Sequence, residues 1–372
     1  MEMSKEQEIS NAGTKDPIIP SSTSPPELAA IPIKWWATFG ALFLIFQLWI
    51  WVRFLISHDC APIPPPAQLS DADQMRLTLI RILEIISPIV GLWVAYRWAL
   101  KPLWRQGHIP SDGLLLLTMP LIFFHDNLTF WFSPWIAWSS LFTNVGSWSG
   151  SIPGAISPTG HITPSPWLFG PLGYIWGLGL PMLGIAWLMR WWKRRFPKTS
   201  NPGIFFVGIG AGFLYDLILD PTGIALQLWA FPGAIQSISV FGGKWYQFPI
   251  NELLCWGTVE GLGANLLYWT NGKGQTIVER GIERLKVSRL RLQVVRFLAM
   301  LCATHLIFLC CYSIPNGILS LNGDFPPPDM PAHLMNRVCG PGTDIICTGK
   351  GVPIMKGRTG FFITPDYQLI RK

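Results

Sequence analysis

The most regular pattern along the chain is a succession of long apolar runs separated by polar segments. Each run is roughly 18 to 23 residues long, about the length that a helix needs to cross the hydrocarbon core of a bilayer. The runs lie near 35–56, 77–96, 113–133, 169–189, 203–220, 249–269 and 295–315. This pattern predicts an all-α, polytopic membrane helical bundle with about seven transmembrane helices, extramembrane outer loops and a C-terminal cap.

The polar segments divide the chain into three parts. Residues 1–32 are polar and contain Pro and Ser but no apolar signal-peptide core, so we expect a disordered N-terminal tail. Residues 33–318 are the predicted transmembrane domain. Residues 319–372 are rich in Pro and Gly, and we expect an extramembrane C-terminal tail that forms an ordered cap.

Composition and charge support this class. Half of the 372 residues are hydrophobic and only 13% are charged, which argues against a water-soluble globule. The net charge of +7 does not indicate nucleic acid, because the basic residues concentrate in the segments after the second, fourth and sixth runs. Basic loops stay inside, whereas segment 134–168 has no Lys or Arg and segment 228–248 has only Lys244. We therefore expect a cytoplasmic N-terminus, an outer C-terminus and the lipid bilayer as a partner.

The seven cysteines do not indicate a metal centre. Four lie in predicted spans, where a small buried hydrophobe is expected, namely Cys255, Cys302, Cys310 and Cys311. Cys60, Cys339 and Cys347 lie on the predicted outer side, and a disulfide between Cys339 and Cys347 fits an oxidising compartment. No pair has CxxC spacing, and the His spacing offers no site either, so we expect no metal and no cofactor.

Acidic side chains inside the apolar runs are the main candidates for chemistry. An ionisable side chain in a span costs roughly 3 kcal/mol on insertion scales and marks a functional site by default. The predicted topology places acids from four separate runs in the outer half of the membrane: Glu84, Asp126, Asp216 with Asp220, and Glu252. Glu260 lies deeper, and Glu84 is expected to pair with Arg81 on its own helix.

Asp216 and Asp220 are four residues apart and share one helix face. Two acids this close cannot both stay ionised cheaply, so at least one should carry a proton near neutrality. A neutral acid beside an ionised one is what general acid/base catalysis needs. Two alternatives stay open. In the first, Asp220, which precedes Pro221, ends a helix and faces water. In the second, Glu252 only complements the dipole of the helix that it begins.

Tryptophan residues gather on the same predicted outer side. Ring faces stabilise a developing cation, so acids with aromatics suit chemistry through a carbocation or an oxocarbenium ion. The two long outer loops, 134–168 and 228–248, either cap such a site or form interfacial turns. The residues concerned are Trp131, Trp135, Trp138, Trp148, Trp167, Trp229, Trp245 and Trp256.

Five segments in order resemble the AveC-like spirocyclase family of integral membrane proteins. They are "HDNLTFWFSPWIAWSSLFTNVGSWSGSIPGAISPTG", "GFLYDLILD", "GGKWYQFPINELLCWG", "NGKGQTIVERG" and "HLMNRVCGPGTDIICTGKGVPI". The resemblance implies an enzyme of polyketide-type metabolism that closes a dihydroxy ketone into a spiroketal, in some members with dehydration. It implies a hemiketal that loses water to an oxocarbenium ion, which the second hydroxyl captures.

The resemblance also assigns residues. The positions that match the family's acids are Asp126, Asp216 and Glu252. The chain departs from the family at two places: His125 and Asn127 flank Asp126 where relatives commonly have Gln and Pro, and Asp220 stands where relatives have Glu.

We therefore predict a catalytic set of Asp126, Asp216, Asp220 and Glu252, with Asp216 as the general acid and Asp126 as the base or the stabiliser of positive charge. The predicted substrate-binding set is His125, Asn127, Asn251, Tyr215, Trp148, Trp229, Trp245 and Trp256. Two alternatives remain open: another cation-forming membrane cyclase that acts on a terpenoid or an epoxide, and a lipid-binding or small-molecule-binding membrane protein or scaffold without catalysis. The sequence predicts no oligomeric state.

Overall fold

The structure is a computed structural model that describes residues 32–66, 68–157, 160–324, 326–327, 329–335, 361–363 and 369–371. These residues are mainly helical. Cys339, Cys347 and residues 1–31 lie outside the described residues, so the disulfide and the N-terminal tail stay predictions. The proposed division at residues 32 and 318 also stays a prediction.

Among the described residues, five helical segments are long and apolar enough to cross a membrane, which indicates an integral membrane protein. Two of them are the single helices α1 (Ile33–Leu55) and α8 (Asn201–Ala225). Each of the other three is interrupted by a short π-helix. In the first, η1 (Tyr96–Leu100) lies between α2 (Asp71–Ala95) and α3 (Lys101–Gln106); in the second, η4 (Ile175–Gly179) lies between α6 (Gly170–Tyr174) and α7 (Leu180–Arg195). In the third, η8 (Leu309–Ser313) lies between α10 (Arg289–Phe308) and α11 (Ile314–Ser320).

The remaining two predicted runs also form helices, but these helices are too short or too polar to count as candidate membrane spans. The run at 113–133 is divided into α4 (Ser111–Ile122) and α5 (Phe124–Thr129), which meet at Phe123. The run at 249–269 forms α9 (Ile250–Tyr268), in which two Glu and two Asn residues lower the mean hydropathy. Most side chains of α4 and α9 are buried in protein. Within the part of the chain that the structure describes, all seven predicted runs are therefore helical, and five of them have the length and hydropathy of a membrane span.

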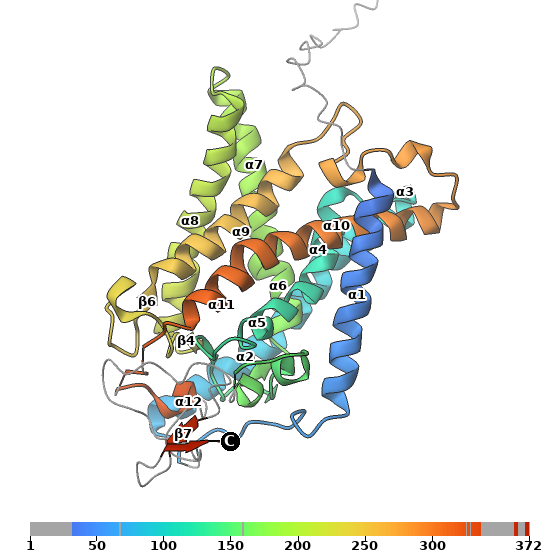
Figure 1. The fold of residues 1–372 in the computed structure, drawn as a ribbon. Coiled ribbons are helices and arrows are strands. Elements are labelled where there is room, and N and C mark those ends of the chain that lie inside the picture. Colours follow the sequence, from blue (N-terminus) through green and yellow to red (C-terminus); the bar gives the residue numbers. More distant parts are fainter. Residues whose placement is uncertain are drawn as a thin grey trace, which may run out of the picture. The chain divides into compact units, whose positions relative to one another are not determined.

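Helices α8 and α9 pack so closely that only glycine fits where they cross. A Cβ atom on Gly212 would lie 2.2 Å from the carbonyl oxygen of Gly257, and one on Gly257 would lie 2.2 Å from the Phe213 ring. Small residues let membrane helices approach in this way. Figure 1 shows α7, α8 and α9 side by side, and α1 crossing α10, with which it is in contact. The buried side of α8 repeats every four residues from Gly208 through Gly212, so Asp216 and Asp220 also point into the protein.

Short strands and 3-10 turns join the helices at one end, which we term the loop end. Strand β1 (Ala137–Trp138) pairs antiparallel with β4 (Trp229–Ala230), so the two long loops 134–168 and 228–248 meet there. The other ladders are β2 (Asn144–Val145) with β3 (Ser165–Pro166), β5 (Ser239–Val240) with β6 (Phe248–Pro249), and β7 (Phe361–Ile363) with β8 (Leu369–Arg371). The turns at this end are η2 (Trp148–Ser151), η3 (Gly160–Ile162), η5 (Gln236–Ile238) and the short helix α12 (Ala332–Met335).

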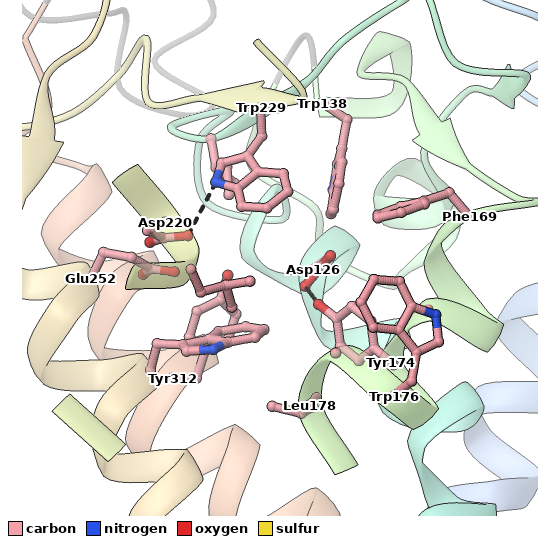
Figure 2. A pocket seen from close by; sticks show the side chains of 15 residues that line it. Asp126, Trp138, Phe169, Tyr174, Trp176, Leu178, Asp220, Trp229, Glu252 and Tyr312 are labelled. Carbon is pink, nitrogen blue, oxygen red and sulfur yellow. Dashed lines mark hydrogen bonds between the residues drawn. The ribbon is translucent and has the colours of Figure 1, made fainter. Parts of the chain in front are cut away.

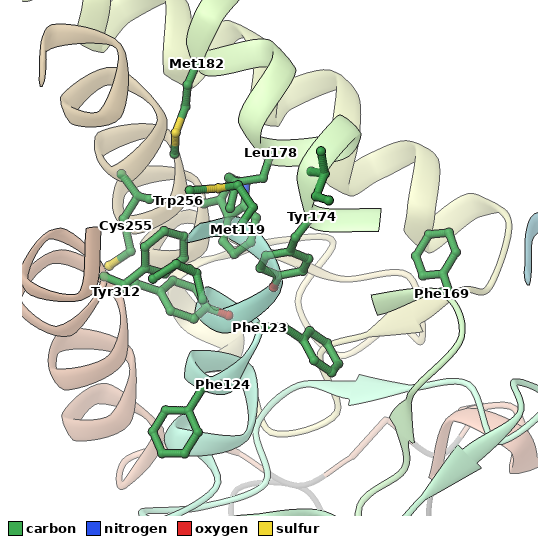
Figure 3. Close-up of a cluster of buried hydrophobic side chains, with 14 of the residues drawn as sticks. Met119, Phe123, Phe124, Phe169, Tyr174, Leu178, Met182, Cys255, Trp256 and Tyr312 are labelled. Atoms are coloured by element: carbon green, nitrogen blue, oxygen red, sulfur yellow. The ribbon is translucent and has the colours of Figure 1, made fainter. Parts of the chain in front are cut away.

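The last two 3-10 turns, η6 (Ile277–Glu279) and η7 (Ile282–Arg284), connect α9 to α10. Glu279 is buried there and pairs with Arg296 of α10 at 2.6 Å. The largest buried cluster lies between these ends and is rich in aromatic and methionine side chains (Figure 3). It includes Met119, Phe123, Tyr174, Trp256 and Tyr312, so the main core and the site described next share side chains.

Candidate active site

A cavity of about 90 Å³ lies near the loop end, and carboxyl groups and aromatic rings line it (Figure 2). The β1–β4 ladder covers one side, and the π-helices η4 and η8 contribute from two others. The lining residues are Asp126, Ile136, Trp138, Phe169, Gly173, Tyr174, Trp176, Gly177, Leu178, Leu219, Asp220, Trp229, Glu252, Trp256 and Tyr312.

Three acids from three different helices face this cavity. Asp126 comes from α5, Asp220 from α8 and Glu252 from α9, and each is buried. These residues are part of the predicted catalytic set, and they are up to 126 positions apart in the sequence. Only the packing of the three helices brings their carboxyl groups to one space.

Each of the three carboxyl groups is held by a different donor. The Tyr174 hydroxyl donates to Asp126 Oδ1. The Trp229 indole Nε1 donates to Asp220 Oδ1 at 3.0 Å, while Asp220 Oδ2 has no partner among the described residues. An oxygen that is buried without a partner in this way is available to a substrate.

Glu252 is oriented by a chain of two amides. Asn316 Nδ2 donates to Glu252 Oε2 at 2.8 Å, and Asn251 Nδ2 donates to Asn316 Oδ1 at 3.0 Å. Glu252 occupies the first turn of α9 but makes no side-chain cap there. Its carboxyl group therefore points into the cavity, and the predicted residue Asn251 acts on it through Asn316.

Aromatic rings enclose the acids. Trp138 and Trp229 face each other across the β1–β4 ladder with ring centroids 5.2 Å apart. Trp256 contacts Tyr312 at 5.2 Å and Tyr174 at 6.0 Å. Figure 2 shows the Trp229 and Trp138 rings on one side of the carboxyl groups and Tyr312 and Leu178 on the other. Such a shell excludes water and presents ring faces to a positively charged intermediate.

Asp216 and Asp220 share a helix face, as the spacing predicted, but only Asp220 lines the cavity. Asp216 lies one turn farther from the loop end and is fully buried. Neither of its oxygens has a hydrogen-bond partner among the described residues, and the same holds for Glu260 of α9. The alternative that Asp220 ends a helix in water is wrong, because α8 continues to Ala225 and Asp220 is buried.

Three of the predicted binding residues hold elements together instead of lining the cavity. His125 Nδ1 lies 2.7 Å from Ser313 Oγ and its Nε2 lies 2.9 Å from His305 Nδ1, so His125 connects α5 to η8 and α10. Asn127 Oδ1 accepts a bond of 2.6 Å from the Ser165 hydroxyl. The Tyr215 hydroxyl donates to the carbonyl of Gly177.

The four predicted binding tryptophans divide into two pairs. Trp229 and Trp256 line the cavity, whereas Trp148 and Trp245 do not. Trp148 is buried against Phe124, with nearly parallel rings, at 12°. Trp245 lies beside the small cluster of Met330 and Leu334. Glu84 also lies outside the cavity and pairs with Arg81, as expected.

Sequence reasoning missed several residues of the site. Tyr174, Tyr312, Phe169 and Trp176 line the cavity and Asn316 orients Glu252, yet none of them was predicted. A signal existed for Asn316 and the two tyrosines, because each is a polar group in or beside an apolar run. This signal is weaker than that of the acids, since carboxyl groups are the costliest groups to bury.

The arrangement can transfer protons and stabilise a cation. Carboxyl, phenol and amide groups that converge on one space supply donors and acceptors, and the surrounding rings supply negative faces. Among the described residues, no group of three or more His, Cys, Asp or Glu side chains is placed to hold a metal ion. The expectation of no cofactor stays a prediction.

Comparison with known proteins adds one match. The sequence profile described as "Spirocyclase AveC-like" matches residues 105–334, more than half of the 372-residue chain. Every residue that lines the cavity lies within this region. No curated protein and no solved structure matches the chain.

Proposed function

Because the chain belongs to the AveC-like spirocyclase family, which makes it a spiroketal-forming enzyme, we propose that its cavity of acids and aromatic rings is the place of ring closure. The observation that carries this proposal is the convergence of Asp126, Asp220 and Glu252 from three helices on one aromatic space. Family membership also implies a polyketide-like substrate.

The proposed reaction converts a dihydroxy ketone into a spiroketal and one water molecule. One hydroxyl oxygen bonds to the ketone carbon, and the proton of that hydroxyl moves to the carbonyl oxygen to give a hemiketal. An acid then protonates the hemiketal hydroxyl, the C–O bond breaks, and water leaves an oxocarbenium ion. The second hydroxyl attacks this carbon, and a carboxylate takes its proton. The carboxyl groups together then hold as many protons as before the reaction, and the proton returns to the donating acid before the next turnover.

The partners of each carboxyl group support an assignment of roles. We assign the role of general acid to Asp220, which donates the proton that leaves with water. Its Oδ2 has no partner among the described residues and can contact a substrate, while Trp229 fixes Oδ1. Asp126, held by Tyr174, stabilises the oxocarbenium ion and accepts the last proton. Glu252 orients a hydroxyl group and is itself oriented through Asn316. Three carboxyl groups around one dry space cannot all be charged, so at least one is protonated.

Asp216, predicted from the sequence as the general acid, is better placed to support Asp220 than to contact a substrate. It lies one helical turn behind Asp220 on the same face and outside the cavity lining. Two buried carboxyl groups at this spacing are unlike two isolated acids, because both of them cannot be charged at little cost.

The enzyme's main contribution is positioning. Spiroketals form without catalysts, so a fixed arrangement of the two hydroxyl groups decides which face of the oxocarbenium ion is attacked. The same acids can assist the loss of a second water molecule from a neighbouring hydroxyl group, which is the dehydration found in some family members.

The finer topology is part of the same proposal. We propose that α4 with α5, and α9, also cross the membrane as inner helices, which makes seven crossings. The basic residues of η1 and α3, those in the last turns of α7 and those after α9 then lie in the cytoplasm, with the N-terminus, and the loop end lies outside.

The decisive experiment uses the purified full chain in lipid nanodiscs with a synthetic dihydroxy ketone. Product is measured by mass spectrometry, and its stereochemistry by chiral chromatography, against the uncatalysed reaction. We expect one stereoisomer to dominate. In Asp220→Asn, kcat should fall by about 100- to 10,000-fold, the range for loss of a general acid. In Asp216→Asn, kcat should fall by a smaller factor.

The matched control is Asp112→Asn, which removes a half-buried acid in the first turn of α4, outside the cavity lining. It should keep the wild-type rate and product. An unchanged rate and stereochemistry in Asp220→Asn and in Asp126→Asn would refute the assignment of the cavity. Conversion of a polyene or an epoxide instead of the ketone would favour the other class of cyclase.

A further inference from the structure

Most of the residues that line the cavity are buried. All of its lining residues are buried except Trp176, Gly177 and Leu219, which are half-buried. The opening of the cavity is therefore inferred at these three residues. Trp176 and Gly177 belong to η4, and Leu219 belongs to α8.

This opening lies between two candidate membrane spans. The spans are residues 170–195 and 201–225, and the three residues lie about six positions, or about 9 Å of helix, from the ends of these spans at the loop end. The α8 surface beside Leu219 is apolar and exposed: Leu214 is 66% exposed, Leu217 46% and Ile218 69%. An exposed apolar surface on a membrane span faces lipid.

The rim of the opening is held by side chains from three helices. The Trp176 indole donates to Ser87 Oγ of α2 at 3.1 Å, and the Ser87 hydroxyl donates to the carbonyl of Phe169 at 3.2 Å. On the other side, the Tyr215 hydroxyl of α8 donates to the carbonyl of Gly177. A Cβ atom on Gly177 would meet no other atom within 4 Å. The glycine therefore leaves space that any larger side chain would fill.

From this geometry we infer that the substrate enters and the product leaves sideways, through the bilayer, between η4 and α8. This inference rests on the proposed function and narrows the substrate class. The substrate is a lipophilic dihydroxy ketone that partitions into the membrane. Its oxygen-bearing part reaches Asp126, Asp220 and Glu252, while its hydrocarbon part extends past Gly177 and Leu219 toward the lipid.

A variant that fills the opening tests this path. Gly177→Leu should lower kcat/KM by about tenfold or more for a ketone with a long alkyl chain, mainly through KM, because the pocket excludes the chain. The stereochemistry of the product should not change. The matched control is Gly184→Leu, since a Cβ atom there also meets no other atom within 4 Å but the residue does not line the cavity. Equal kinetics in the two variants would overturn the inference.

Thermal unfolding of both variants in detergent shows whether either one fails to fold. Leu219→Trp fills the opening from α8 and should reproduce the loss if Gly177→Leu proves unstable. Normal long-chain kinetics in a folded Leu219→Trp variant would equally count against the path.

A second measurement does not depend on turnover. In liposomes, a lipophilic maleimide should label Leu219→Cys, and an added spiroketal with a long alkyl chain should protect this cysteine. Peptide mass spectrometry separates it from the native cysteines. Labelling without protection would overturn the sideways path, even if the enzyme is active. Protection without any conversion of the dihydroxy ketone would support the path and contradict the proposed reaction.

Discussion

At the scale of single residues, three similar acids become different because each has its own partner. Asp126 is bound by a phenol, Asp220 by an indole on one oxygen only, and Glu252 by an amide that a second amide holds. Tyr174 and Asn316 come from segments far from the acids they bind, whereas Trp229 lies nine residues after Asp220, in the strand that follows α8. A sequence shows which residues can ionise, but these donors decide which proton can move.

The amide chain behind Glu252 gives a graded prediction. Asn316→Leu removes the direct donor and leaves Glu252 Oε2 unpaired, at a cost of about 1–3 kcal/mol for a buried acceptor. We expect kcat to fall by roughly tenfold, since each 1.36 kcal/mol changes a rate tenfold. Asn251→Ala removes only the second amide and should lower kcat by a smaller factor. Initial rates of spiroketal formation, with a pH profile for each variant, measure this order. A larger loss in Asn251→Ala than in Asn316→Leu would contradict the chain.

At the scale of elements, the crossing of α8 and α9 sets the position of the acids. Both helices carry glycines four residues apart, Gly208 with Gly212 and Gly257 with Gly261. Farther along each helix toward the loop end, the same inward stripes present Asp216 and Asp220 on α8 and Glu252 on α9. The close crossing and the convergence of acids are consequences of one packing arrangement.

This arrangement predicts opposite effects for two glycines of the same helix. Gly212→Ala puts a Cβ atom 2.2 Å from a backbone oxygen of α9, so the helices must separate. Overpacking of this kind costs about 1–3 kcal/mol, and the midpoint of thermal unfolding in detergent should fall. Gly210→Ala meets no atom within 4 Å and should leave the midpoint unchanged or raise it, because alanine favours a helix by up to about 1 kcal/mol. If both variants unfold at the wild-type midpoint, the crossing is looser than described.

At the scale of the whole molecule, the chain exposes apolar side chains on its outer surface and buries ionisable side chains inside. In the most apolar parts of α1 and α8 only 22% of the residues are buried in protein, as suits helices that face lipid. Helix α12 closes the loop end: the Ser140 amide donates to the carbonyl of His333 at 2.8 Å, and Met330 and Leu334 form a small cluster with Ala230. Because Ala230 follows Trp229 in β4, α12 supports the strand that covers the cavity.

The contact between α12 and α2 should weaken in acid. His333 Nδ1 lies 3.6 Å from Asp73. Burial lowers the pKa of His333, Asp73 opposes this shift, and Arg76 adds to it. A lowered folded-state pKa means that stability is complete above the ordinary His pKa of about 6.5 and is lost as the pH falls below it. We expect the midpoint of thermal unfolding to fall between pH 7.5 and 5.5, and less so in His333→Gln.

The control for this measurement is His58→Gln, which changes an exposed histidine and should behave as wild type. An equal loss of stability in His333→Gln and wild type would show that His333 does not contribute to the effect.

The sequence alone determined the class of the protein and its family, because hydrophobic length, charge asymmetry and local motifs are properties of contiguous residues. It also identified Asp126, Asp220 and Glu252, since a carboxyl group in an apolar run is conspicuous without any coordinates. The tertiary structure decided that Asp220 and not Asp216 lines the cavity, and that His125, Asn127 and Tyr215 bind protein groups. It also placed Tyr174 and Tyr312 in the cavity lining and Asn316 within hydrogen-bond distance of Glu252. The physical reason is that depth along a helix, donor pairing and enclosure depend on how distant segments pack, and a one-turn shift of about 5 Å exchanges one acid for another.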